Sequence, residues 1–154
     1  MRDWYLSNNL LLNADKSGVV VLGTANQLRL AAAVDSIEVA GVTLPVAPKL
    51  KSLGVILDQR LTFNDHASAV AKARNYHARA IKHVRHLLSE SVAQTLACSL
   101  INSRLDYCNS LLYGAPESTI NKLQRAQNNA ARVVLAAKRH SDAKPLLRLS
   151  LIHI

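Results

Sequence analysis

The sequence predicts an α+β fold in two parts, a β-rich part over residues 1–58 and a helical part over 59–149. Short apolar runs bounded by Gly, Pro and Asn fill the first part, and this pattern is typical of strands and hairpins. In the second part, apolar residues recur at helical spacing over long stretches. Charge divides at the same place. Residues 1–58 hold 5 of the 19 Lys and Arg and 5 of the 10 Asp and Glu, so the remaining 14 basic and 5 acidic residues carry the whole net charge of +9.

The first part is expected to begin with the end of a helix over 3–8 and to continue in short strands. The predicted strands are 10–13, 19–22, 28–34, 37–39, 42–44 and 53–57. Three alanines reduce the β propensity of 28–34. Ala40 and Gly41 stand between two of the apolar runs, and glycine at that place predicts a hairpin turn.

Four helices are predicted in the second part, over 63–88, 89–113, 116–138 and 142–149. Thr62 is the expected N-cap of the first helix and Ser89 that of the second, with Ser91 as the alternative. Gly114 and Pro116 separate the second helix from the third, because Gly is favoured after a helix and Pro at its start. The residues expected on the buried faces of the first three helices are Phe63, Ala67, Val70, His77, Ile81, Val84 and Leu88, then Val92, Leu96, Ser99, Leu100 and Leu111, then Ile120, Leu123, Gln127, Ala130 and Val134.

The first of these helices is predicted to carry a stripe of basic and polar residues opposite its apolar side. The stripe consists of Lys72, Asn75, Arg79, Lys82 and His86. Because no acidic residue occurs over 66–88, ion pairs along the helix do not account for the stripe. Lys and Arg spaced by one or two helical turns can contact successive phosphates of a nucleic acid without reading its sequence. A solvated helix face without a partner is the alternative.

Two arginines do not follow this pattern. Arg74 and Arg85 fall at the edge of the apolar side of the same helix, so each needs a partner there. His77 on the apolar side is expected to be a core histidine. The amide side chains of the third helix, Gln124, Gln127, Asn128 and Asn129, are expected to pack between helices through buried hydrogen bonds.

No pattern of Ser, His and Asp or of Cys and His that would indicate nucleophilic catalysis emerges. Cys98 and Cys108 would lie roughly 15 Å apart on one straight helix, which is too far for a disulfide, so both are expected to be reduced. No apolar run is long enough for a membrane helix, and the N-terminus lacks the apolar region of a signal peptide. We therefore expect an intracellular protein, nuclear or cytoplasmic, without a membrane partner.

Four segments, in this order, resemble the end of the palm and the thumb of reverse transcriptases from non-LTR (LINE-type) retrotransposons. They are NLLLNADKS (9–17), KSLGVILD (51–58), SRLDYCN (103–109) and KLQRAQNNAAR (122–132), accompanied by Trp4, Phe63 and His66. The resemblance extends over nearly the whole chain. It implies a small β-rich palm remnant with hairpins over 1–58, a three- to four-helix thumb-like bundle over 59–149 and an atypical tail over 150–154.

The resemblance also implies roles for individual residues. Lys16 would be a cation near the pyrophosphate of the incoming nucleotide in the parent enzyme. Leu53 and Gly54 would belong to a primer-grip-like hairpin, and the basic stripe would face the primer–template duplex. Polymerases of this family hold Mg²⁺ with a Tyr-x-Asp-Asp turn and an earlier Asp, whereas no Asp-Asp pair occurs in this chain.

The sequence therefore predicts a truncated fragment of an RNA-directed DNA polymerase. It would be inactive alone, would hold no cofactor, and would lack the remaining palm and fingers portion of the same polymerase. Its residual function would be sequence-independent binding of RNA, DNA or a hybrid duplex. The alternatives are a helical protein-interaction module and a non-functional product of a decayed element.

Overall fold

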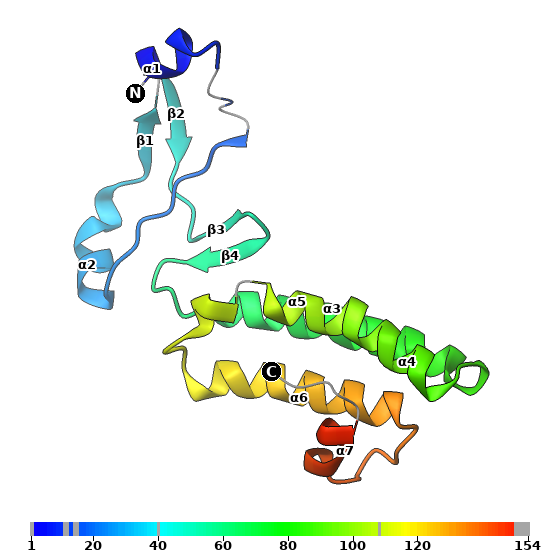
Figure 1. Ribbon diagram of the computed structural model, residues 1–154. Helices are drawn as coiled ribbons and strands as arrows, with labels where there is room; N and C mark the ends of the chain where they lie inside the picture. Colours follow the sequence, from blue (N-terminus) through cyan, green and yellow to red (C-terminus); the bar gives the residue numbers. More distant parts are fainter. Residues whose placement is uncertain (1, 11–12, 14–15, 40, 108, 150–154) are drawn as a thin grey trace. The chain divides into compact units, whose positions relative to one another are not determined.

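The computed structural model describes residues 2–10, 13, 16–39, 41–107 and 109–149 (Figure 1). The chain divides into two compact units, Met1–Leu61 and Thr62–Ile154. Within the described residues, every strand belongs to the first unit and the long helices belong to the second. The α+β class predicted from the sequence is therefore confirmed, with the hairpins preceding the long helices.

Two separate antiparallel hairpins make up the described β structure of the first unit. β1 (Ser36–Val39) pairs with β2 (Val42–Pro45) in the register Val39 to Val42 and Ser36 to Pro45. Gly41 turns this hairpin with a φ of 84°, a left-handed conformation that glycine adopts without steric cost. The hairpin predicted around Gly41 is confirmed.

The second hairpin joins β3 (Lys49–Ser52) to β4 (Val55–Asp58). Leu53 and Gly54 form its turn with φ values of 47° and 83°, and two successive positive φ values are typical of a type I′ hairpin turn. The predicted buried strand over 53–57 is wrong at its start, because Leu53 lies at the turn with 86% of its surface exposed. The strand begins at Val55, which is buried.

Two other predicted strands of the first unit are not found, and a third lies partly outside the described residues. The segment predicted as a strand over 28–34 lies in α2 (Ala25–Leu30) and a 3₁₀ turn over Ala31–Ala33. A capping box starts this helix: Thr24 Oγ1 accepts from the Gln27 N–H, and Gln27 Oε1 accepts from the Thr24 N–H. Over 19–22 the chain forms a single parallel bridge, from Val19 to Val46. Within 10–13, residues 11 and 12 lie outside the described residues and the other two are not in a strand. The predicted helix near the N-terminus is present as α1 (Arg2–Ser7).

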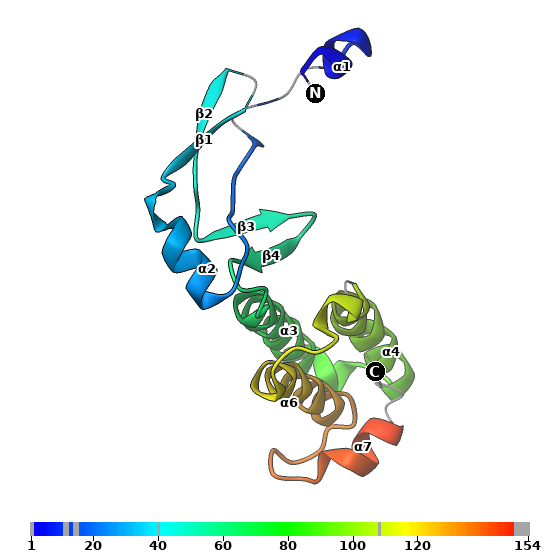
Figure 2. The same cartoon turned by 90° about the vertical axis from the view of Figure 1, so that its left-hand side faces the viewer.

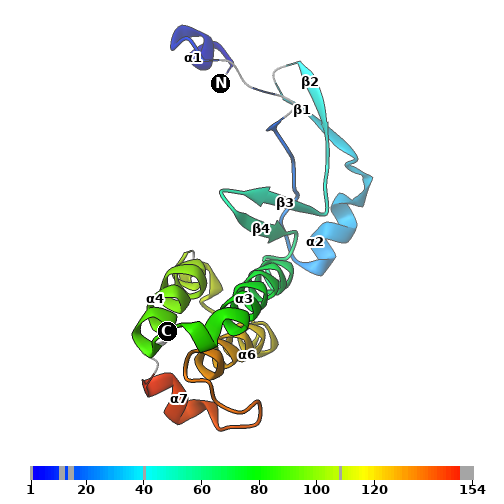
Figure 3. The same ribbon diagram turned by 90° about the vertical axis from the view of Figure 1, so that its right-hand side faces the viewer.

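The second unit consists of α-helices joined by 3₁₀-helical and π-helical turns. Its elements are α3 (Asn64–Val84), a 3₁₀ turn (Arg85–Leu87), α4 (Glu90–Ala97), a π-helical turn (Cys98–Asn102), α5 (Ser103–Asp106), a 3₁₀ turn (Asn109–Leu112), α6 (Glu117–Val134) and α7 (Ala143–Leu149). Figures 2 and 3 show α3, α4 and α6 nearly end-on, side by side around a common core, with α7 beside α6. All four predicted helices are therefore present, the second in several pieces.

Cross-contacts show that α3 and α6 run parallel to each other. Near their beginnings, the Lys122 ammonium donates to the side chains of Asn64 and Ser68. Near their ends, Arg85 donates to the Val134 carbonyl. The intervening α4 and α5 return the chain in the opposite direction (Figure 1).

Small side chains form much of the core between these helices. The core cluster consists of Ala78, Ile81, Ala97, Ile101, Ala130 and Val134. Alanine allows two helix backbones to approach closely, and these positions bury it completely or almost so. This explains why the predicted buried faces are partly wrong, because the largest apolar residues do not mark the contacts.

On α4 and its continuation the buried residues are Ala93, Ala97 and Ile101, whereas Val92 and Leu100 are exposed. On α6 the predicted Leu123, Gln127, Ala130 and Val134 are buried, whereas Ile120 is exposed. On α3 the buried residues of the helix are His66, Ala67, Arg74, Ala78 and Ile81, whereas Val84 is exposed and His77 is half-buried. The buried face of α3 is thus centred on the side of the helix that carries Arg74, and not on the side that carries His77. The prediction that placed His77 in the core is wrong.

The start of α3 also differs from the prediction that Thr62 is its N-cap. Phe63 occupies the N-cap position in a left-handed conformation, with a φ of 54°, and its side chain is buried. Thr62 Oγ1 accepts from the N–H of Asn64 at 3.4 Å. Thr62 therefore binds one of the unpaired N–H groups of the first turn, although it stands one residue before the N-cap.

Candidate functional site

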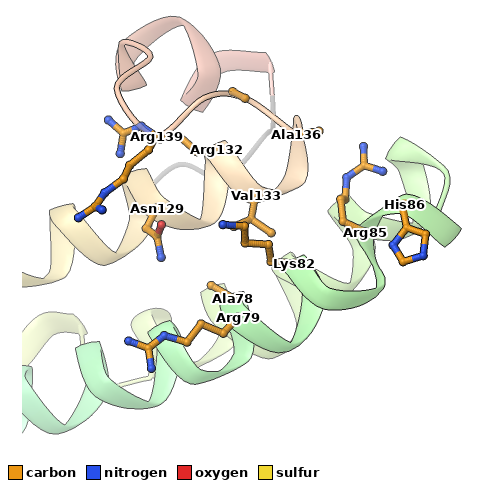
Figure 4. Close-up of a pocket in the computed structure, with 11 residues that line it drawn as sticks. Ala78, Arg79, Lys82, Arg85, His86, Asn129, Arg132, Val133, Ala136 and Arg139 are labelled. Atoms are coloured by element: carbon orange, nitrogen blue, oxygen red, sulfur yellow. The ribbon is translucent and has the colours of Figure 1, made fainter.

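A basic groove lies between the C-terminal halves of α3 and α6 (Figure 4). Its cavity has a volume of about 720 Å³. The residues that line it are Ala78, Arg79, Lys82, Arg85, His86, Asn129, Arg132, Val133, Ala136, Ala137 and Arg139. They include five Lys or Arg side chains and one His, and no Asp or Glu. We call this site the basic groove.

One wall of the groove comes from α3 and the 3₁₀ turn that follows it. Arg79, Lys82 and His86 succeed one another at intervals of three and four residues, so they lie on one face of the helix. All three side chains are exposed. Figure 4 shows Lys82 pointing from α3 toward α6 and Arg79 beside it.

The other wall comes from the end of α6 and the segment after it. Two residues after the end of α6, Ala136 has a left-handed conformation with a φ of 49°. The N–H groups of Ala136 and Ala137 donate to the carbonyls of Val133 and Arg132, which is the Schellman pattern. Arg132 Nε also donates to the Ser141 carbonyl at 3.0 Å. These bonds hold the segment that places Arg139 at the groove.

Arg85 joins the two walls. Its Nε donates to the Val134 carbonyl at 2.7 Å and its Nη1 to the Leu88 carbonyl at 2.8 Å. A cation at the last carbonyls of a helix is favoured by the helix dipole. Arg85 therefore holds α3 against the end of α6, and its positive charge contributes to the groove.

Arg74, three helical turns before Arg85, is fully buried between α3 and α6. Its Nη1 donates to the Leu123 carbonyl at 3.2 Å, whereas its Nε and Nη2 have no hydrogen-bond partner in the described structure. Burial lowers the pKa of Arg74 to about 10, and the negative charge of Asp106 acts in the opposite direction. Each of the two arginines expected to need a partner thus binds one backbone carbonyl of α6, and Arg85 makes a second hydrogen bond to the Leu88 carbonyl.

The predicted stripe on α3 is only partly available for binding. Lys72, Arg79, Lys82 and His86 are exposed, and the last three line the basic groove. Asn75 is half-buried and accepts a hydrogen bond from Asn129 Nδ2 at 3.1 Å. Asn75 is therefore engaged in the contact between α3 and α6, and the prediction that it faces a ligand is not supported.

Of the amide side chains of α6, Asn129 makes the predicted hydrogen bond between helices, to Asn75, whereas the bonds of Gln124 stay within α6. Gln124 Nε2 donates to Gln127 Oε1 at 3.1 Å and to Asn128 Oδ1 at 2.9 Å. Gln127 is buried. Asn129, through its bond to Asn75, connects this set to α3 next to the basic groove.

Sequence reasoning did not find Arg132, Arg139 and Arg85 as members of the site. The signal available for two of them was the run Lys138-Arg139-His140 and the single basic residue in the last turn of α6, Arg132. Neither indicates that these residues lie beside α3, because that depends on the parallel packing of two helices far apart in the sequence.

The other predicted site residues belong to the first unit. Lys16 is exposed, and its backbone N–H donates to the carbonyl and the side-chain oxygen of Asn13. Leu53 and Gly54 lie at the turn of the second hairpin. A hairpin is thus present where the primer-grip-like hairpin was predicted. The role itself stays a prediction.

The described residues contain no group of three or more His, Cys, Asp or Glu side chains that could hold a metal ion. They also contain no helix with the length and apolar character needed to cross a membrane. Cys98 is half-buried with a free thiol. The predicted separation of Cys98 and Cys108 involves Cys108, which lies outside the described residues.

The fold and the groove thus define a small α+β protein with a basic groove on its helical unit. No protein-family model, no curated protein and no solved structure matches the chain.

Proposed function

We propose that this protein binds nucleic acid without sequence preference through the basic groove and the adjoining face of α3. The observation that carries the proposal is the composition of the groove: five Lys or Arg side chains from α3, α6 and the segments that follow them, and no acidic residue. Phosphates bind such surfaces by releasing counterions, and these contacts depend on charge, not on base sequence.

The uneven charge of the chain supports the same proposal. Residues 1–58 are neutral overall, and the rest of the chain carries the net charge of +9. A polyanion would therefore be attracted to the helical unit from a distance.

The reverse-transcriptase resemblance adds a specific origin to this proposal. We propose that the chain derives from the palm edge and thumb of a non-LTR retrotransposon polymerase. Because it contains no Asp-Asp pair, the chain by itself would bind nucleic acid without polymerising it. Lys16, Leu53 and Gly54 would act only together with the rest of such a polymerase.

The test is the binding of a fluorescent RNA–DNA hybrid, measured by anisotropy over a series of salt concentrations. The variant K72E/R79E/K82E should weaken binding about 100-fold, because each reversal replaces an attraction to phosphate by a repulsion. Neutral K82Q alone should reduce the slope of log affinity against log salt by about 1.

The matched control is R125E/K144E/R148E. These three side chains are also exposed in the helical unit, and none lines the groove. The control changes the net charge by the same amount, so it should weaken binding only a few-fold. Equal losses in the two variants, or binding that does not depend on salt, would refute the proposal that the groove is the site.

A further inference from the structure

An exposed tyrosine lies within the basic face of α3, which we define by the exposed side chains of Lys72, Arg79, Lys82 and His86. Tyr76 has 69% of its surface exposed. Lys72 precedes it by four residues and Arg79 follows it by three, so both cations are its neighbours on the helix surface. Its ring meets the ring of His77 edge-on, with centroids 5.5 Å apart and an interplanar angle of 77°.

This tyrosine does not serve the core of the helical unit. Two other neighbours on the helix surface, Ala73 and Ala80, are small, and Ala80 is itself exposed. Tyr76 is therefore a single exposed aromatic ring between two cations. It does not belong to a broad apolar face of the kind that binds another protein.

An aromatic ring set among cations has the composition of single-strand binding surfaces. Such surfaces use positive side chains to follow the sugar–phosphate backbone and aromatic side chains on which bases stack. In a duplex the bases are already stacked on each other, so an exposed ring reaches only the backbone. A single strand can place an unstacked base against the ring.

We propose that Tyr76 stacks a base of a single-stranded nucleic acid while Lys72 and Arg79 contact the phosphates on either side. This inference rests on the proposed function and specifies its ligand. Arg79 also lines the basic groove, so the strand would continue from Tyr76 into the groove. The distance from Lys72 to Lys82 along the helix axis is about 15 Å by helical rise, enough for contacts to several nucleotides.

The test compares Y76A and Y76F on three fluorescent ligands: a single-stranded oligonucleotide, an abasic oligonucleotide of the same length, and a duplex. Y76A should weaken binding of the single strand about tenfold, whereas Y76F, which keeps the ring, should bind like the unmodified protein. Binding of the abasic oligonucleotide and of the duplex should not change. The salt dependence should also stay the same, since the tyrosine ring has no charge.

Y113A is the matched control. Tyr113 is 97% exposed and lies outside the basic face, so its loss should leave all three affinities unchanged. Because Tyr76 is exposed, thermal unfolding of Y76A should occur at the same temperature as that of the unmodified protein.

The outcomes separate this inference from the function on which it rests. If Y76A binds the single strand as well as the unmodified protein does, or loses the abasic ligand equally, stacking at Tyr76 is refuted while salt-dependent binding stands. If the unmodified protein binds none of the three ligands, both proposals are refuted.

Discussion

Two arginines on one helix show how the same residue type can have opposite effects on stability. Arg74 and Arg85 are eleven residues apart on α3 and its 3₁₀ extension, and they bind carbonyls eleven residues apart on α6. Arg74 is fully buried with two nitrogens unbonded in the described structure, whereas two nitrogens of Arg85 bind carbonyls at helix ends. A buried charge with few partners is costly, and a cation at a helix C-terminus is favourable.

We therefore expect the same substitution to act differently at the two positions. R74M should leave the free energy of unfolding unchanged or raise it by about 1 kcal/mol, because methionine fills much of the space without a charge. R85M should lower it by about 1–2 kcal/mol, because two charged hydrogen bonds are lost. Urea unfolding of both variants measures the difference. A loss of more than about 2 kcal/mol in R74M would show that the single bond to Leu123 outweighs the cost of burial.

We expect the stability of the protein to depend on pH through His66. It is buried at the start of α3, with 6% of its surface exposed, and burial lowers its pKa below the ordinary value of 6.5. As the pH falls below 6.5, the unfolded chain takes up a proton at His66 that the folded protein resists. The free energy of unfolding should therefore fall with pH in this range and be fully retained above it.

The variant H66Q isolates this contribution, because the other five histidines are present in both proteins. As the pH is lowered from 7.5 to 5, the free energy of unfolding of the unmodified protein should fall relative to that of H66Q. Urea titrations at several pH values measure it. A difference that does not change with pH would contradict the lowered pKa.

At the scale of elements, the second helix of the bundle depends on a defined start. Ser89 Oγ accepts from the Val92 N–H at 3.3 Å and serves as the N-cap of α4. Ser91, the alternative cap, lies inside the first turn, where its Oγ is 3.0 Å from Ser89 Oγ. The choice of Ser89 over Ser91 from the sequence is confirmed.

S89A should therefore lower the free energy of unfolding by about 1 kcal/mol, and S91A should change it by less than about 0.5 kcal/mol. The two variants remove the same hydroxyl group two residues apart, so thermal unfolding followed by circular dichroism compares them directly. Equal effects would mean that the cap bond of Ser89 contributes nothing specific.

The π-helical turn Cys98–Asn102 explains why the buried residues after α4 differ from those predicted from the sequence. A π turn adds a residue to the helical repeat, so a stripe drawn at regular spacing changes phase there. The predicted Ser99 and Leu100 fall in this turn and are exposed, whereas Ile101 is buried.

At the scale of the whole molecule, the two units differ in how much core they contain. The core cluster of six buried residues lies entirely in the second unit. In the described part of the first unit, only Leu44 and Val55 are buried apolar side chains. Its exposed large apolar residues are Trp4, Leu6, Leu10, Leu22, Leu30, Val34, Ile37, Val39, Val42, Leu53 and Leu61.

We expect residues 62–154 alone to unfold cooperatively on heating with a helical circular dichroism spectrum. Residues 1–61 alone should show no cooperative transition and should aggregate, because many exposed apolar side chains with little core favour association. Two-stranded hairpins are also marginal without a core to pack on. Calorimetry and light scattering of the two fragments measure this. A cooperative, monomeric 1–61 fragment would contradict the expectation.

The sequence by itself determined the order of the parts, with the hairpins before the long helices. It also determined the turn at Gly41, the break at Gly114 and Pro116, and the concentration of charge in the second part. These features follow from local conformational preferences and from composition, which do not depend on distant residues.

Only the tertiary structure decided which face of α3 is buried and where the basic groove lies. Arg74 and Arg85 are drawn inward because carbonyls of α6, distant in the sequence, accept hydrogen bonds from their guanidinium groups. Arg132 and Arg139 join Arg79 and Lys82 because α6 packs parallel to α3 and its end is turned by Ala136. The physical reason is that small residues let the two helices approach closely along an alanine-rich contact. The position of these small residues around each helix, and not the size of its apolar residues, decides which face is buried and therefore where the charged side chains lie.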